Sequence, residues 1–172
     1  MISTLLVAVT VAAAAIQPQL GKDDYSSKFK IIFESAKKHF KTEKTGAGSA
    51  ITDGNFVMEY TPLTKFDNAL LNRVVVDKDD AVWYQLRYDA GTDKAEAEKK
   101  FAEAVELTKT LVPSTFSMGT TYSDQYEKGE VTTLEHKSDV FAEVMKRPSI
   151  RMGLMQKDGR YIIEMMMMEA FF

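Results

Sequence analysis

The sequence predicts an α+β fold in which two amphipathic helices pack on one face of a mostly antiparallel sheet. Two segments repeat apolar residues every three or four positions, which is the period of a helix. The other segments alternate apolar and polar residues between turn-forming residues, which is typical of antiparallel strands. The 172 residues include no cysteine, so packing must stabilise the domain without disulfides or thiolate metal sites.

The uncharged first twenty residues precede the predicted domain. The run Leu5–Ala15 has the length of a signal-peptide apolar region and ends in small residues that suit cleavage. We therefore predict a signal peptide at residues 1–15, a short linker at 16–23 and one α+β domain at 24–172. This places the protein in the periplasm or outside the cell. The alternatives are an uncleaved membrane anchor and a buried helix of the fold. Both are disfavoured, because each normally needs a longer apolar run.

The first helix is predicted in the segment that follows the linker. Asp24 or Ser26 caps its N-terminus, and the glycine-containing stretch Thr45–Gly48 ends it. Lysines flank its apolar face in one stripe, which could meet an anionic membrane or an acidic partner but is more commonly a solvated flank. The apolar face consists of Tyr25, Phe29, Ile32, Phe33, Ala36 and Phe40, and the lysine stripe of Lys30, Lys37, Lys41 and Lys44.

Three strands are predicted next, and the last two form a hairpin. They cover residues 56–60, Asn68–Val76 and Ala81–Asp89, with Pro62 in the first turn and Lys78–Asp80 in the second. If residue 77 faces residue 81, the alternation gives the hairpin one nearly apolar face and one mixed face. The pairs on the mixed face are Val75 with Trp83, Arg73 with Gln85, and Leu71 with Arg87.

The second helix is predicted from Asp93 to Val112. Asp93 and Glu96 form a capping box, or Thr92 caps instead, and Pro113 stops the helix. Its apolar stripe, which would face the sheet, consists of Ala97, Phe101, Ala104, Val105, Thr108, Leu111 and Val112.

The remainder is predicted to form strands that end in a second long hairpin. Lys157–Gly159 supplies its turn, because Asp-Gly accepts the positive φ angles of a tight hairpin. Each half of the chain therefore opens with a helix and closes on a hairpin, which raises the hypothesis of a tandem αβββ pseudo-repeat. The strands cover residues 115–123, 130–137, 140–145, 149–156 and 160–169.

Charge and motif content disfavour several classes of function. A formal charge of −3 and a pI near 5.5 lack the basic footprint of nucleic-acid binders. We expect no nucleic-acid partner, no cofactor, no metal site and no stable membrane insertion of the mature domain. The only histidines, His39 and His136, have no serine or carboxylate at a motif spacing. Met165–Met168 could bind Cu(I), but successive strand residues point to opposite faces, so packing explains them better.

The mixed face of the first hairpin is the candidate binding site. It places the only tryptophan, Trp83, beside Arg73, Gln85 and Arg87. Tryptophan and arginine are enriched in binding hot spots, and two guanidinium groups suit an anionic or carboxylate ligand. The same pattern also fits an outer sheet face on which arginine stems cover the ring, or a face buried by the second half.

Two functions are consistent with these residues. The first is an exported, non-catalytic binding or interaction domain whose partner is a protein or a small anionic ligand. The alternative is a small-ligand or lipid carrier, with an apolar pocket between helices and sheet lined by Phe29, Phe33, Phe101 and methionines. An enzyme ranks third, because no catalytic motif occurs in the sequence.

Overall fold

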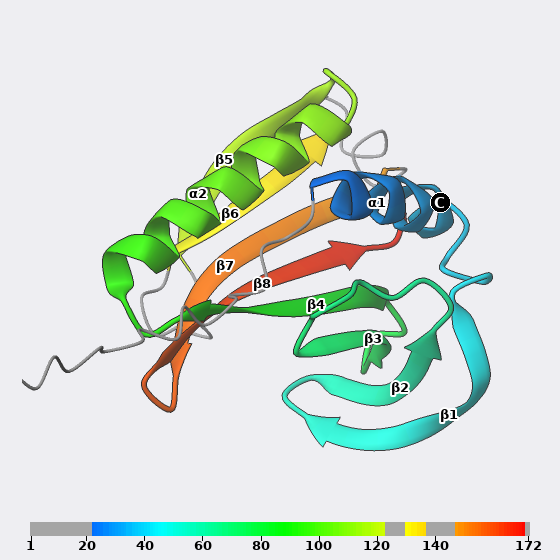
Figure 1. Cartoon of the computed structure of the whole chain (residues 1–172). Helices are drawn as coiled ribbons and strands as arrows, with labels where there is room; N and C mark the ends of the chain where they lie inside the picture. Colours follow the sequence, from blue (N-terminus) through cyan, green and yellow to red (C-terminus); the bar gives the residue numbers. More distant parts are fainter. Residues whose placement is uncertain (1–21, 123–129, 137–146, 171–172) are drawn as a thin grey trace, which may run out of the picture.

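The computed structural model describes residues 22–122, 130–136 and 147–170 (Figure 1). The predicted signal peptide and the predicted strand at 140–145 lie outside these residues. The described chain forms two helices and eight strands. They are α1 (Lys22–Ala36), β1 (Lys44–Asp53), β2 (Phe56–Pro62), β3 (Leu71–Asp77), β4 (Val82–Gly91), α2 (Lys94–Leu111), β5 (Phe116–Tyr122), β6 (Glu130–His136), β7 (Ser149–Lys157) and β8 (Arg160–Met168).

All of these strands belong to one sheet with the order β1-β2-β3-β4-β8-β7-β6-β5. Every neighbouring pair is antiparallel, so the predicted α+β class with an antiparallel sheet is confirmed. β4 and β8 pair at the centre, and β1 and β5 form the edges. Neither helix of the described chain combines the length and the apolar character needed to cross a membrane.

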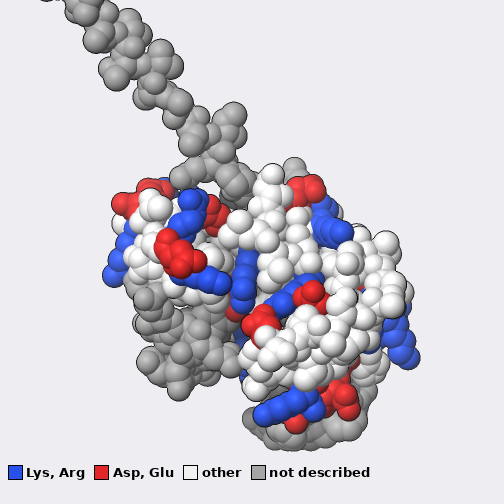
Figure 2. Space-filling model, turned by 90° about the horizontal axis from the view of Figure 1, so that it is seen from below, with Lys and Arg blue, Asp and Glu red and all other residues white. Residues whose placement is uncertain are grey.

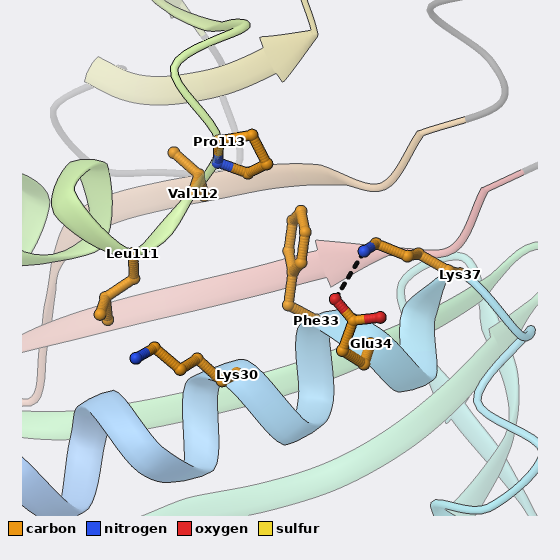
Figure 3. A pocket seen from close by; sticks show the side chains of 7 residues that line it. All are labelled: Lys30, Phe33, Glu34, Lys37, Leu111, Val112 and Pro113. Atoms are coloured by element: carbon orange, nitrogen blue, oxygen red, sulfur yellow. Dashed lines mark hydrogen bonds and ion pairs between the residues drawn. The ribbon is translucent and has the colours of Figure 1, made fainter.

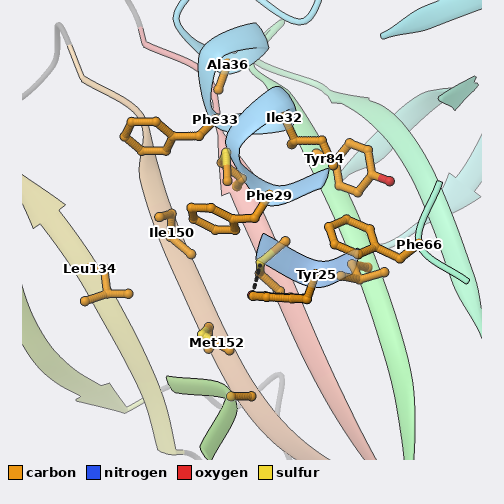
Figure 4. Close-up of a cluster of buried hydrophobic side chains, with 14 of the residues drawn as sticks. Tyr25, Phe29, Ile32, Phe33, Ala36, Phe66, Tyr84, Leu134, Ile150 and Met152 are labelled. Atoms are coloured by element: carbon orange, nitrogen blue, oxygen red, sulfur yellow. Dashed lines mark hydrogen bonds between the residues drawn. The ribbon is translucent and has the colours of Figure 1, made fainter. Parts of the chain in front are cut away.

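One large core cluster joins buried side chains of both helices to the sheet. The rings of Phe29 and Phe33 stack 6.0 Å apart, and Phe33 meets Phe116 of β5 edge-on at 5.7 Å between ring centres. Figure 4 shows these α1 side chains directed at the strands. All six residues of the predicted α1 apolar face are buried, which confirms that prediction. The helix is thus held mainly by burial of aromatic surface.

The four consecutive methionines of β8 divide between the two sides of the sheet. Met165 and Met167 belong to the large core cluster. Met166 is buried in a second cluster on the opposite side, and Met168 packs against its margin. This alternation follows from the two-residue period of a strand. The methionines therefore fill space on both faces, as the packing interpretation predicts.

α1 ends earlier than the sequence predicts. The helix stops at Ala36, and His39 and Phe40 then adopt positive φ angles of 57° and 50°. The Phe40 amide donates to the Ser35 carbonyl at 2.9 Å, which closes the turn. The stretch 45–48, predicted to end the helix, instead lies in β1 beside a register shift, and Gly46 has a φ of 71°. That prediction was wrong because glycine marks a strand bulge as readily as a helix end.

α2 forms where the sequence predicts it. Asp93 is its N-cap, and the Asp93 carboxylate accepts a hydrogen bond from the Glu96 amide at 2.9 Å. The helix ends at Leu111, next to Pro113. Its buried residues, Ala97, Ala104, Val105 and Thr108, all belong to the predicted apolar stripe.

Both predicted hairpins are present. In the β3–β4 hairpin, Arg73 lies opposite Gln85, so the predicted register is confirmed. In the β7–β8 hairpin, Lys157 pairs with Arg160, which leaves Asp158-Gly159 in the turn. The φ angles of this dipeptide, 51° and 75°, are those that a two-residue type I′ turn requires.

The order of elements repeats along the chain. α1 precedes β1–β4, and α2 precedes β5–β8. In each half the strands run in order from a sheet edge to the centre, where β4 pairs with β8. Within the described residues each half therefore shows four strands, one more than the predicted αβββ unit, and in the first half the additional strand is β1.

Candidate functional site

The four candidate residues lie together on the sheet face that points away from the large core cluster. β3 places Arg73 opposite Gln85 of β4, and Trp83 precedes Gln85 by two residues on the same face. β4 pairs with β8, which brings Glu164 opposite Arg87. We call this surface of β3, β4 and β8 the outer face. The structure thus joins the predicted residues and adds an acidic one.

Trp83 forms the apolar part of the outer face. Its side chain is buried, with only 8% of its surface exposed, and its indole Nε1 donates to the Asp77 carboxylate at 3.0 Å. The Arg151 guanidinium of β7 lies 5.3 Å from the ring centre, within the range of a cation–π contact. The ring is buried because residues from β1 and β2 pack against its cluster, which comprises Val75, Ala81, Trp83 and Met166, with Ile51, Phe56 and Met168 at the margin.

Arg73 connects the outer face to the first two strands. Its Nε donates to Gln85 Oε1 at 2.6 Å, and its Nη1 donates to Glu59 Oε2 at 3.2 Å. Its Nη2 donates to Asp53 at the end of β1. This guanidinium holds the pKa of Asp53 below its usual range, mainly through the hydrogen bond. All three guanidinium nitrogens of Arg73 are therefore engaged, and the side chain positions β1 and β2 against β3.

Glu164 is the outer-face residue that the sequence analysis missed. It is buried, and its Oε1 accepts hydrogen bonds from Gln85 Nε2 at 2.7 Å and from Arg87 Nε at 2.6 Å. One signal was present in the sequence, since Glu164 is the only charged residue between Tyr161 and Met168. A lone carboxylate in an apolar strand predicts a buried partner. The sequence did not indicate which strand supplies that partner.

Of the four predicted site residues, Arg87 is the one with hydrogen-bonding capacity left over in the described chain. Its Nε is held by Glu164, and 27% of its side chain is exposed. Within the described chain, no residue hydrogen-bonds its two terminal nitrogens, Nη1 and Nη2. These nitrogens form one planar edge, which suits the two oxygens of a carboxylate or a phosphate. Arg87 is thus a guanidinium held in place by a buried acid, with an open edge.

The polar groups of the outer face are paired with one another. Its guanidinium, amide and carboxylate groups are paired across β3, β4 and β8, and none of these groups is a nucleophile next to a base. Figure 2 shows basic and acidic side chains interspersed in a hollow on the face seen from below, beside uncharged surface. Such mixed charge suits a partner that offers both hydrogen-bond donors and acceptors.

The residues proposed for an apolar pocket belong to the packed core or to a shallow cleft. Phe29 is fully buried between neighbouring rings. Phe33, in contrast, lies beside a cleft of about 300 Å³ between α1 and the end of α2. Figure 3 shows its ring between the ammonium groups of Lys30 and Lys37. The cleft is lined by Lys30, Phe33, Glu34, Lys37, Leu111, Val112 and Pro113.

The two histidines have separate structural surroundings. His39 Nδ1 lies 3.0 Å from Glu169 Oε2, and the other oxygen of Glu169 accepts from the Val82 amide at 2.8 Å. This links the turn after α1 to the chain beyond β8. His136 meets Phe116 edge-on at 5.9 Å between ring centres, and its buried Nδ1 has no partner in the described chain.

Comparisons with models of protein families, with curated proteins and with solved structures found no match.

Proposed function

We propose that this protein is an exported, non-catalytic interaction domain that binds a partner through the outer face. The observation that carries the proposal is the open edge of Arg87, whose Nε is fixed by Glu164 while Nη1 and Nη2 lack partners in the described chain. An anionic group of the partner docks on this edge. Because the guanidinium is already held in one orientation, binding costs little side-chain entropy.

Arg151 supplies a second contact on the same face. It is exposed and lies over the Trp83 ring. β7 and β4 are separated by β8, so the two arginines stand on strands about 10 Å apart. A ligand that uses both must extend across the sheet. This spacing favours a polypeptide partner with an acidic group over a small anion.

The test distinguishes binding by the Nη1 and Nη2 atoms of Arg87 from the structural pairing of Arg87 with Glu164. Arg87→Lys keeps a positive charge beside Glu164 but removes the planar edge, and it is combined with Arg151→Gln. Arg160→Lys is the matched control, since Arg160 pairs with Asp89 at the other end of β8. Tagged variants are incubated with the exported proteins of the host, and the retained partner is quantified.

The double variant is expected to retain at least tenfold less partner than the wild type, with a nearly unchanged melting temperature. The Arg160→Lys control should retain the partner fully. Equal retention by the double variant and the wild type would remove the outer face as the binding site. Trp83→Ala is unsuitable for this purpose, because it would open a cavity in a buried cluster.

The second candidate function is a small-ligand or lipid carrier. It is favoured by the cleft beside Phe33, which has an apolar wall from the end of α2 and two lysines at its rim (Figure 3). This arrangement suits a small amphiphile with an acidic group. Native mass spectrometry of the protein purified from its own host tests it. A copurifying small molecule is expected, and a mass equal to that of the polypeptide alone would count against the carrier.

We also propose that the two halves are a tandem repeat, with both helices on one face of the sheet. The repeated order of one helix and four strands supports this, as does the antiparallel pairing of β4 with β8 at the centre. The presence of residues from both helices in one core cluster supports the placement of the helices.

A further inference from the structure

The exposed side of α1 and the turn that follows it carry three lysines without partners among the described residues. Lys30, Lys38 and Lys41 are exposed, and no ion pair or hydrogen bond joins their ammonium groups to another described residue. Lys37 lies nearby, where it pairs with Glu34 at 2.5 Å and its ammonium group stands 5.1 Å from the centre of the Phe33 ring. We call the exposed side of α1 and the turn that follows it the α1 surface.

The charge of the α1 surface is opposite to that of the whole chain. Its four lysines and one glutamate give a local charge of +3, whereas the chain has a formal charge of −3. The remainder of the chain therefore carries −6. Lys44, which the sequence placed in the same stripe, lies in β1 with its ammonium group 5.8 Å from the Tyr60 ring centre. The α1 surface is thus a locally basic patch on an acidic protein.

Apolar surface lies between these lysines. Ile31 is 53% exposed, among the most exposed of the large hydrophobic side chains in the described chain. A cleft of about 400 Å³ lies beside it, lined by Lys30, Ile31, Glu34, Ser35, Lys38 and Thr42. The cleft beside Phe33 shares Lys30 and Glu34 with it (Figure 3). The α1 surface is therefore a ridge with an exposed aliphatic side chain, shallow apolar clefts and flanking ammonium groups.

We infer that the α1 surface docks the protein onto a lipid bilayer that contains anionic headgroups. Lysine is a hydrated point charge on a flexible stem, which suits a fluid layer of phosphates better than the planar fork of arginine does. The apolar side chain of Ile31 adds contact with the acyl boundary, which an acidic protein surface would not reward. Docking is peripheral, since it needs no helix that crosses the bilayer.

This docking is independent of the proposed binding at the outer face, although it shares Lys30 and Lys37 with the cleft of the second candidate function. α1 packs its buried side against the large core cluster, and the outer face lies on the other side of the sheet. A domain that rests on a membrane through α1 therefore leaves the outer face free. Loss of either activity would leave the other unchanged, so the two proposals can fail separately.

Vesicle co-sedimentation of the full chain tests the inference. The probes are vesicles of phosphatidylcholine alone and vesicles with one part in five phosphatidylglycerol, and the readout is the ratio of the two partition coefficients. This ratio removes any contribution of the uncharged N-terminal segment, which does not distinguish the two lipids. The wild type is expected to prefer the anionic vesicles, and the preference should fall as salt is raised.

The charge variant is Lys30→Glu combined with Lys38→Glu and Lys41→Glu. Each lysine near an anionic surface is worth about fivefold in partitioning, so the variant should lose at least a hundredfold of the preference, on the order of five cubed. The matched control is Lys65→Glu with Lys78→Glu and Lys99→Glu, which changes the net charge equally at other exposed positions. Equal losses in both triple variants, or no preference in the wild type, would overturn the inference.

Ile31→Ser tests whether the apolar side chain of Ile31 contributes to vesicle binding in addition to the charge of the lysines. It should weaken binding to the anionic vesicles several-fold while the lysines are unchanged. Leu63→Ser, which alters a 68% exposed leucine in the loop between β2 and β3, is the control and should bind as the wild type does. If Ile31→Ser also binds these vesicles as the wild type does, Ile31 makes no contact with the acyl boundary, and that part of the inference is overturned.

Discussion

β4 has two buried faces of opposite chemistry. Toward the helices it presents Tyr84 and Leu86, which belong to the large core cluster. On the outer face it presents Gln85, which hydrogen-bonds Arg73 and Glu164. Tyr84 and Gln85 are adjacent in the chain and almost equally buried, with 0% and 2% of their surfaces exposed. Burial alone therefore does not distinguish the two faces.

The difference is in what stabilises each face. The helix side is stabilised by removal of aromatic and aliphatic surface from water, and a smaller side chain there leaves a cavity. Around Gln85 the outer face is stabilised by pairing, and loss of one partner there leaves a buried polar group without a hydrogen bond, whereas around Trp83 it buries apolar surface. The two faces should therefore respond differently to truncation and to pH. The outer face is also the one with unused hydrogen-bonding capacity, at Arg87.

The largest effect is expected from truncation on the helix side. Tyr84→Ala should lower the free energy of unfolding by about 3–5 kcal/mol, because a fully buried ring is replaced by a cavity. Tyr84→Phe keeps the ring and loses only the hydroxyl, which donates to the Thr64 carbonyl at 2.7 Å. Its expected loss is about 1 kcal/mol. Urea denaturation measures both, and equal losses would mean that the hydroxyl rather than packing stabilises this face.

Alkaline pH should also act on the helix side. Burial raises the pKa of Tyr25 to about 12 and raises the pKa values of Tyr84 and Tyr88 as well. Because these folded-state pKa values exceed the unfolded-state value of 10.0, stability is intact below about pH 10 and is lost as the pH rises toward about 12. Denaturation midpoints between pH 8 and pH 11 check this. Tyr25→Phe should flatten the decline, and an unchanged slope in that variant would contradict it.

On the outer face, Glu164→Gln should lower the free energy of unfolding by less than the truncation of Tyr84 does. The amide oxygen still accepts a hydrogen bond, but the charge that holds Arg87 is removed, so we expect a loss of about 1–3 kcal/mol. Asp89→Asn is the control at the more exposed pair with Arg160 and should cost less than Glu164→Gln. Similar losses in the two variants would show that burial of Glu164 adds nothing to the pair.

Local patterns predicted much of this fold. The register of the β3–β4 hairpin could be derived because a one-residue slip would move Tyr84 out of the core and Gln85 into it. α2 could be placed because Asp93 and Pro113 bracket a helical stripe. The four candidate residues could be placed on one face for the same reason, since all of them belong to that one hairpin.

The remaining features depend on pairing between distant segments. β1 contains two glycines within five residues and is a strand because β2 pairs with it, which no local pattern indicates. Likewise, the partner of Glu164 depends on the neighbour of β8 in the sheet, and β4 lies about seventy residues earlier in the chain. The burial of Trp83 depends on Ile51 of β1 and Phe56 of β2. The basic and aromatic residues of the outer face could be predicted from the sequence, but the acidic residues that pair with them could not.

Low pH should lower the stability of the outer face, and this is the smallest loss of stability that we predict. Arg73 lowers the pKa of Asp53, so the pair adds stability above the unfolded-state value of 3.8 and loses it as the pH falls through the lower folded-state value. Asp53 is largely exposed, which limits the size of the effect. Urea denaturation between pH 6 and pH 2.5 should therefore show a shallower acid loss for Asp53→Asn than for the wild type.

Asp158→Asn is the control for this measurement, because Asp158 is exposed in the β7–β8 turn and no ion pair joins it to another described residue. Its acid profile should match that of the wild type. If Asp53→Asn matches the wild type as well, the end of β1 is not held to Arg73 by charge. Apolar contacts of Ile51 and Phe56 would then suffice to cover Trp83. In that case, only the hydrogen bonds of Glu164 with Gln85 and Arg87 would distinguish the outer face of β4 from its helix side.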